Sequence, residues 1–392
     1  MPDNSVYQRN NQKIPAREIL QALADGMEIQ LSDCTITDQL NLNRLFMPEE
    51  KFSLQNLPVR EESAGRVITL KQPLNFNACT FENDVFFAPL WDKPGTLKVI
   101  FEKDILFNSS IFNSPMRFSE AFFRGTASFD GCLFSRVCCF RQAVFAGRAL
   151  FRTATFEGYG LFNDCRFEQD ARWVNTCFAR GTNFVQAYFG GDVDFGGVYS
   201  RSKSVPVHDG VRFAKTTFGE DESFWRFIKQ TCQDAGYYQQ AGESFYRERC
   251  ANFWKRMRGF NYEQLPAHRK ILRWLSAVRL VPELVFGRWL FGYGERPVRV
   301  LLTAILVIIF CGLFYSSRFC HLMEQGTIRR LSLSFVDGIY FSTITFTTVG
   351  YGEMYPAPTD LLTRMMVMFE AFSGVFLMPM FVVCLAKRFS RS

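Results

Sequence analysis

The sequence predicts a multidomain protein in which an N-terminal β-solenoid precedes an α-helical membrane domain. Three observations support this: Phe recurs at regular intervals, two long apolar runs lie near the C-terminus, and basic residues concentrate before the first run. Of 392 residues 44 are Phe, although the apolar fraction of 48% is ordinary, and one extreme residue type indicates a repeat. The charged fraction of 21% argues against a disordered chain and against a membrane protein with many spans.

The Phe repeat has a period of eleven residues, divided into alternating steps of six and five. It runs through Phe101, Phe107, Phe112, Phe118, Phe123, Phe129, Phe134, Phe140, Phe145, Phe151, Phe156, Phe162, Phe167, Trp173, Phe178, Phe184, Phe189 and Phe195. A small residue stands two positions before most of them, such as Ala121 before Phe123. Residues two apart on a strand point the same way, so both would face inward before the chain turns a corner. Such faces wind into coils that stack at about 4.8 Å.

A right-handed coiled coil is the other structure with an eleven-residue period. At about 100° per residue, however, the apolar positions of this repeat circle a helix without forming a stripe. Scattered glycines, such as Gly125 and Gly147, weaken a helix further. The solenoid is therefore favoured.

The repeat resembles that of the pentapeptide-repeat family, most specifically over 101–195 and more weakly over the rest of 29–224. This resemblance implies a right-handed quadrilateral β-helix, which we assign to 29–221. Because steps of five and six alternate here, one coil should take about 22 residues. Further coils are indicated by Cys34-x-Ile36, Gln39–Leu42, Leu74-x-Phe76, Cys79-x-Phe81, Val85-x-Phe87, Val211-x-Phe213 and Thr216-x-Phe218. Pro89–Val99 and Ser200–Asp209 break the rhythm and are expected to be loops.

Open strand edges at both ends of a solenoid need caps. We expect an N-terminal helical cap over 1–28, with its helix at Ile14–Gly26, and a helical linker with an interfacial helix over 222–295. The twelve cysteines lack a CxxC pair and the three histidines lie far apart, which argues against a zinc site. Several cysteines occupy the small position of the repeat, so we expect free thiols in a reducing cytosol. The net charge of −1 over 76–224 argues against DNA mimicry.

The positive charge is concentrated in residues 225–300, with 14 basic and 6 acidic side chains. Lys and Arg beside a hydrophobic span mark the cytoplasmic side of a membrane. A nucleic-acid surface is the weaker interpretation, and we expect no nucleic-acid partner. The amphipathic stretch Ile271–Phe291 contains Trp274 and Trp289, which is typical of a helix lying on the inner leaflet. We expect contacts with membrane lipids there, with gating by anionic lipid as a sharper alternative.

Two runs, Val298–Tyr315 and Leu361–Ala386, are long and apolar enough to span a membrane. We predict helices over 298–317 and 360–387 within a membrane domain of residues 296–392. Basic residues precede the first run and follow the second, so both termini, and with them the solenoid, are predicted on the cytoplasmic side of the cell membrane.

Between the two runs, a predicted helix over 335–347 leads into the segment 348–352. The segment reads Thr348-Val349-Gly350-Tyr351-Gly352. It closely resembles the selectivity filter of tetrameric potassium channels, and the resemblance to two-transmembrane prokaryotic members covers about 296–388. Potassium exchanges its hydration shell for rings of backbone carbonyls, and glycines permit the backbone angles that this requires. The resemblance implies K⁺ bound at Thr348, Val349, Gly350 and Tyr351, a homotetramer, and no cofactor besides the transported K⁺.

Further residues are expected to have supporting roles. Thr347, Glu353 and Glu370 are expected to support the filter, although Glu353 stands where the family commonly has Asp. An ionisable residue inside a membrane helix is functional by default. We expect Glu370 behind the 335–347 helix, bonded to a hydroxyl or backbone group, or alternatively facing the ion cavity. Gly374 and Pro379 are candidate hinges of the second helix, and close helix packing is the alternative for Gly374.

The sequence therefore predicts a potassium-selective channel whose gating or assembly is modulated by the solenoid and the linker, through an unknown ligand or protein partner. The alternative is a membrane-anchored scaffold whose solenoid binds a protein. An enzyme is disfavoured because the sequence contains no nucleophile–base pair, phosphate loop or metal cluster.

Overall fold

The structure is a computed structural model that describes residues 6–50, 52–54, 56–63, 65–89, 97–214, 221–258, 265–325 and 333–389. It divides into two compact units, Met1–Arg256 and Met257–Ser392. Most of the predicted loop Pro89–Val99, the predicted coil at Thr216-x-Phe218, and the basic Arg391 lie outside the described residues.

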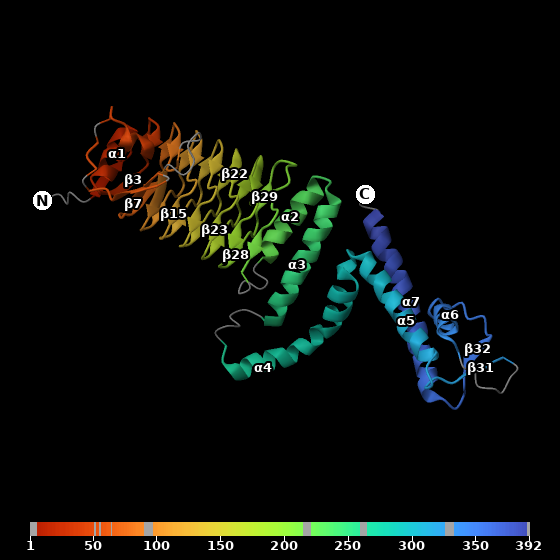
Figure 1. The fold of residues 1–392 in the computed structure, drawn as a ribbon. Helices are drawn as coiled ribbons and strands as arrows, with labels where there is room; N and C mark the ends of the chain where they lie inside the picture. Colours follow the sequence, from red (N-terminus) through yellow and green to blue (C-terminus); the bar gives the residue numbers. More distant parts are fainter. Residues whose placement is uncertain are drawn as a thin grey trace. The chain divides into compact units, whose positions relative to one another are not determined.

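Short strands of the first unit form four sheets, whose members are paired in the following orders (Figure 1). The first contains β1 (Val6–Asn10), β3 (Glu28–Ser32), β8 (Leu74–Asn77), β12 (Ile105–Leu106), β16 (Ala127–Ser128), β20 (Ala149–Leu150), β24 (Ala171–Arg172) and β28 (Val193–Asp194). The second contains β2 (Lys13–Ile14), β4 (Thr35–Ile36), β9 (Thr80–Phe81), β13 (Ile111–Phe112), β17 (Leu133–Phe134), β21 (Thr155–Phe156), β25 (Cys177–Phe178) and β29 (Tyr199–Ser200). The third contains β5 (Leu40–Asn41), β10 (Val85–Phe86), β14 (Met116–Arg117), β18 (Cys138–Cys139), β22 (Tyr159–Leu161) and β26 (Gly181–Asn183). The fourth contains β6 (Val59–Glu62), β7 (Gly65–Leu70), β11 (Leu97–Phe101), β15 (Phe122–Phe123), β19 (Val144–Phe145), β23 (Arg166–Phe167), β27 (Tyr188–Phe189) and β30 (Arg212–Phe213).

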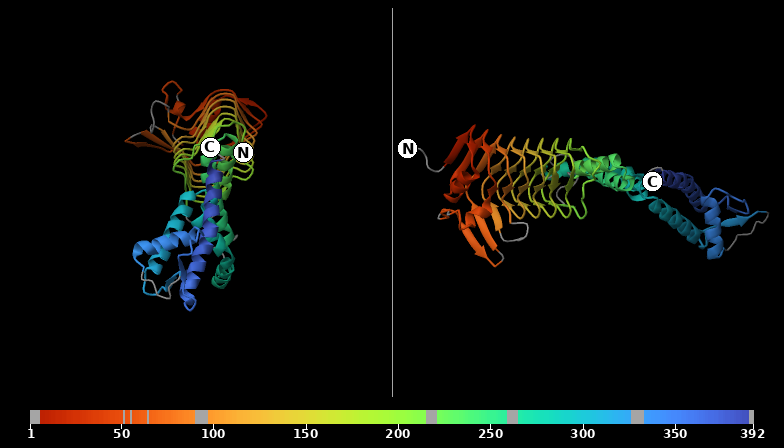
Figure 2. Two further views of the ribbon diagram at one scale, coloured as in Figure 1. Left: turned by 90° about the vertical axis from the view of Figure 1, so that its right-hand side faces the viewer. Right: turned by 90° about the horizontal axis from the view of Figure 1, so that it is seen from above.

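The chain visits the four sheets in turn, and we call one such circuit a coil. Ala127 pairs with Ala149, and Ala149 pairs with Ala171, so a coil here takes the predicted 22 residues. Pairing within the four sheets is parallel except between β6 and β7, which are antiparallel. The coils of the first unit are stacked along one direction, and the left panel of Figure 2 looks along the stack. These parallel strands are consistent with the predicted solenoid.

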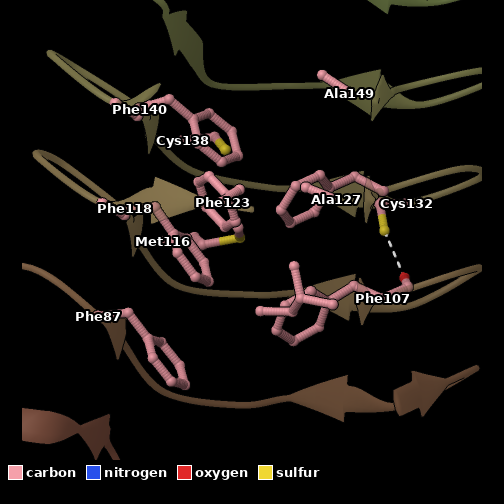
Figure 3. Close-up of a cluster of buried hydrophobic side chains, with 14 of the residues drawn as sticks. Phe87, Phe107, Met116, Phe118, Phe123, Ala127, Cys132, Cys138, Phe140 and Ala149 are labelled. Atoms are coloured by element: carbon pink, nitrogen blue, oxygen red, sulfur yellow. Dashed lines mark hydrogen bonds between the residues drawn. The ribbon is translucent and has the colours of Figure 1, made fainter. Parts of the chain in front are cut away.

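Aromatic side chains fill the interior of the stack (Figure 3). Each ring lies on the ring one coil away: Phe129 stacks on Phe107 and on Phe151, with centroid distances of 5.5 and 5.2 Å. Small residues fill the remaining space, and four of the cysteines among them donate to backbone carbonyls, as Cys132 Sγ does to Phe107 O at 2.7 Å. All twelve cysteines are free thiols. Burial raises the pKa of the Cys79 thiol to about 12, which keeps it uncharged and unreactive.

The two step lengths of the repeat correspond to two kinds of corner. Every eleventh residue from 109 to 197 has a left-handed backbone, with φ between 55 and 70°. These residues are Ser109, Glu120, Gly131, Gln142, Thr153, Asp164, Asn175, Gln186 and Gly197. The first eight fall in five-residue steps, where a turn closes by a hydrogen bond such as that from the Ala121 N–H to Phe118 O (3.2 Å), and Gly197 follows the last repeat member, Phe195. A left-handed φ at the third of the four turn residues is the geometry of a type II turn. A corner of this kind therefore takes one residue fewer than the corner in a six-residue step.

Helices cover both ends of the stack. At the first end, α1 (Ala16–Ala24) buries Ile19, Leu20 and Leu23. Within 1–28, where we predict a helical cap, strands β1 and β2 flank the helix, and they pair with β3 and β4. The backbone groups of β1 and β2 continue the hydrogen-bonding pattern of the first and second sheets. The first coil therefore begins before residue 29.

At the other end, α2 (Glu222–Asp234) places Phe224 and Phe227 on the last aromatic rings of the stack. The centroid of Phe224 lies 5.1 Å from that of Phe195, and Phe227 lies 5.9 Å from Phe178. Helix α3 (Tyr238–Arg258) follows and is joined to α2 by ion pairs: Glu248 contacts Arg226 at 3.0 Å and Lys229 at 2.7 Å. The helix α2 therefore belongs to the first unit, whereas the sequence pattern places it in the linker.

The second unit begins with a helical stretch that changes its winding. Helix α4 (Ala267–Ser276) continues through a 3₁₀ turn, η3 (Ala277–Leu280), into a π-helical segment, η4 (Glu283–Leu290), and a short turn, η5 (Gly292–Gly294), follows. The stretch Ile271–Phe291, where we expect an interfacial helix, is therefore helical, but it is not a single uniform α-helix.

The remaining elements form a helical hairpin around a shorter helix. Helices α5 (Pro297–Tyr315) and α7 (Leu361–Phe389) flank α6 (Phe335–Phe346), and two short strands, β31 (Leu322–Glu324) and β32 (Met354–Pro356), pair in antiparallel fashion. The three helices begin within one residue of the predicted positions, and α5 ends two residues early. Helices α5 and α7 are long and apolar enough to cross a membrane.

Candidate functional site

The candidate site lies where α6 ends. The N-terminus of α6 is capped by a capping box, in which the side chains of Ser334 and Asp337 each form a hydrogen bond with the backbone of the other residue. The helix ends at Phe346, and Thr347 Oγ1 donates to Thr343 O at 2.7 Å, which ties this residue to the last turn. The chain then enters 348–352 directly.

The backbone of 348–352 alternates between positive and negative φ. Thr348, Gly350 and Gly352 have φ of 58, 49 and 79°, whereas Val349 and Tyr351 have negative φ. A β-branched residue such as Thr348 rarely has positive φ. Reversal at every second residue allows successive carbonyls to lie on the same side of the chain, as a row of carbonyl ligands requires.

The start of this segment is held by the end of α6. The N–H of Thr348 donates to Thr345 O, and the N–H of Val349 donates to Ile344 O, both at 3.0 Å. The Thr348 hydroxyl donates to Thr347 O at 2.7 Å. The side chains that follow are exposed in a single chain: Val349 is 55% and Tyr351 is 65% exposed.

Helix α6 is packed closely against α5 at two glycines. A Cβ on Gly338 would lie 2.4 Å from Gly312 O, and one on Gly312 would lie 2.5 Å from the Ile339 side chain. Neither glycine was identified from the sequence, because the close approach of two helices depends on their crossing point rather than on a local pattern.

Glu370 of α7 lies in the interior of the helical hairpin and is fully buried. Its Oε2 accepts a hydrogen bond from the Tyr315 hydroxyl of α5 at 2.7 Å, and its Oε1 is bonded to the Ser342 hydroxyl of α6. One carboxyl group therefore connects all three helices. In this structure it faces hydroxyl groups of neighbouring helices and is shielded from solvent.

A second polar cluster, which sequence reasoning missed, lies between β31 and the start of α7. Asp360 Oδ2 accepts from Thr363 Oγ1 at 2.6 Å and lies 2.8 Å from His321 Nδ1. The hydrogen bond from Thr363, followed by that from His321, lowers the pKa of the Asp360 carboxyl below its ordinary value. These residues lie about forty positions apart, and no motif links them in the sequence.

The other predicted residues are placed as follows. Glu353 is exposed, and its carbonyl accepts from the Gln325 N–H at 3.0 Å. Helix α7 continues through both Gly374 and Pro379 without a break. Gly374 lies against the last residue of α6. Within the described residues no group of three His, Cys, Asp or Glu side chains could hold a metal ion.

Comparison with known proteins gives one finding for this part of the chain. Residues 302–391 match the family model described as ion channel. No curated protein and no solved structure matches the chain. The match and the two apolar helices indicate an ion channel located in a membrane, which is the coarser form of the prediction. The conducted ion, the oligomeric state and the roles of single residues stay predictions.

Proposed function

We propose that this chain is one subunit of a homotetrameric potassium channel, in which α5, α6, the segment 348–352 and α7 form the pore. The observation that carries the proposal is the alternating backbone of 348–352, placed at the C-terminal end of a short helix between two apolar helices. The negative end of the α6 dipole would favour a cation beside that segment.

Four chains are proposed because one segment supplies only one side of an ion pathway. A ring of carbonyls around K⁺ needs several copies arranged about an axis, and closed cyclic symmetry supplies them. The exposure of Val349 and Tyr351 in one chain supports this, since large apolar side chains of a membrane pore are expected to be covered by neighbouring subunits.

A flux measurement tests the proposal. Full-length protein in liposomes should pass K⁺, with little Na⁺ passing, and the K⁺ flux should be blocked by barium. Equal Na⁺ flux, or no flux from protein shown to be tetrameric, would contradict it.

A single substitution separates the channel from the membrane-anchored scaffold. Gly350 has φ of 49°, and a Cβ added to it would have no atom within 4 Å. Ala is therefore disfavoured at this position by the left-handed backbone conformation, and not by a clash with other atoms. Gly350→Ala should abolish selective flux while leaving expression and membrane insertion intact. A scaffold would keep its cellular phenotype in this variant, whereas a channel would lose it.

For the first unit we propose a right-handed quadrilateral β-helix of the pentapeptide-repeat kind, which modulates gating or assembly. The 22-residue register and the inward aromatic residues support this assignment. Because α2 closes the stack and leads through α3 to the second unit, a change in the stack has a covalent path to α5. Deleting 1–220 should change the open probability or the tetramer yield; unchanged values of both would refute the role.

We also propose that α4 and η4 lie on a lipid surface. Trp274 is 67% and Trp289 69% exposed, and Ile271 is 62% exposed, which is costly for a surface in water. Arg269, Lys270 and Arg279 lie on the same stretch, so anionic lipid headgroups would match its charge.

A further inference from the structure

The hydroxyl of Ser342 lies between two acceptors. Its Oγ is 2.8 Å from Ile308 O of α5, and it is also bonded to Glu370 Oε1 of α7. A serine hydroxyl has one hydrogen to donate. If Glu370 were a carboxylate, Ile308 O and Glu370 Oε1 would have to share that single hydrogen, and both contacts would be weaker than a full hydrogen bond.

We propose that Glu370 carries a proton on Oε1 and acts as a neutral, proton-dependent positioning residue that joins α6 to α5 and α7. The hydrogen bonds then form one continuous chain in which every donor has an acceptor. Tyr315 donates to Oε2, the Oε1–H of Glu370 donates to Ser342 Oγ, and Ser342 donates to Ile308 O. Tyr315 and Ser342 are themselves buried, at 2% and 0% exposure.

The surroundings of Glu370 supply no compensating charge. The ionisable groups that face it are Tyr315 and Cys311, both on α5, while α6 offers Ser342. Among the described residues no Lys, Arg or His faces the carboxyl. An unpaired carboxylate inside an apolar helical bundle is strongly disfavoured, whereas a neutral acid that donates and accepts does not carry that cost.

Loss of the proton would act on the pore through α6. Deprotonation removes the donor to Ser342 and places a negative charge among three apolar helices. Because α6 ends directly before 348–352, its displacement would move the segment that we assign to ion binding. Flux should therefore fall as the pH rises, and this consequence rests on the proposed function, whereas the protonation state does not.

Infrared difference spectroscopy tests the protonation state without reference to flux. Full-length protein in liposomes, titrated from about pH 6 to about pH 10, should show a protonated carboxylic C=O band that disappears at high pH. Glu370→Gln should lack this band. Glu324→Gln, which changes an exposed carboxyl of the same unit, should keep it. Absence of the band in the wild-type protein at the acidic end, or its persistence in Glu370→Gln, would overturn the proposal.

Flux in the same liposomes tests the positioning role. Gln can donate to Ser342 and accept from Tyr315, so Glu370→Gln should conduct without the alkaline fall, while Glu370→Leu should lose about tenfold or more of the flux because Tyr315 and Ser342 lose their partner. Rescue by Gln but not by Leu supports the proposal. Equal loss in both variants, with the band present in the wild-type protein, would overturn the positioning role while leaving the proposed channel function untouched.

Discussion

Gly374 of α7 lies against the carbonyl oxygen of Phe346, the last residue of α6, so closely that a Cβ at this position would stand 1.8 Å from that oxygen. No real Cβ can occupy such a position. Helix α7 passes Gly374 without a break, so in this conformation the glycine provides close packing between the second long helix and the end of α6.

Gly374→Ala should displace α6 or α7 and destabilise the helical unit by about 1–3 kcal/mol, as overpacking does. The expected readouts are a lower melting temperature in detergent and a lower yield of the proposed tetramer. Ser373→Ala is the matched control, because it removes only a hydroxyl that donates to Phe369 O of its own helix. A purely flexible hinge predicts the opposite: the variant would keep its stability and tetramer yield and change only the opening of the pore.

Phe140→Ala should destabilise the stack of coils by about 3–5 kcal/mol, because it leaves a cavity between two stacked rings. Phe140 is fully buried, and its ring lies 5.8 Å from that of Phe118 and 5.4 Å from that of Phe162. Chemical denaturation followed by circular dichroism measures the change. Phe122→Ala removes a ring that is only half-buried in the same region and should cost clearly less. Equal costs would show that the inward aromatic residues do not dominate stability.

The cluster at Asp360 should make the second unit sensitive to acid. The pKa of Asp360 is lowered in the folded protein, so its contribution to stability is complete above the ordinary Asp pKa of about 4 and is lost as the pH falls through the folded value. Asp360→Asn should therefore reduce the melting temperature near neutral pH and flatten its decline in acid. The measurement is the melting temperature between about pH 7 and about pH 3; a decline as steep as that of the wild-type protein would assign the acid sensitivity to other groups.

Trp274 and Trp289 should lie among lipid acyl chains if α4 and η4 rest on a membrane. Lipids brominated near the headgroup should quench tryptophan fluorescence of the reconstituted protein, and Trp274→Phe together with Trp289→Phe should remove most of that quenching. Trp173 offers the control, since it is fully buried within the stack and should be inaccessible to bromine. Quenching that is unchanged in the double variant would refute the lipid contact.

Much of the fold could be predicted because its signals are local and repeated. The inward positions of the coils follow from the alternation of side chains on a strand, and the 22-residue circuit follows from the two step lengths. The ends of the stack were harder to predict. Strands β1 and β2 carry no aromatic member of the repeat, and they join the sheets because their backbone groups find partners in β3 and β4.

By itself the sequence determined the periodic coils, the two apolar helices and the segment 348–352, because each depends on residues that are close together in the chain. Only the tertiary structure decided that Gly374 meets Phe346, that His321 meets Asp360, and that Ser342 stands between Ile308 and Glu370. These contacts join segments that lie far apart in the chain, and their positions are set by how helices cross and pack. A sequence pattern marks which residues are polar or small, but the crossing of the helices determines which of them meet.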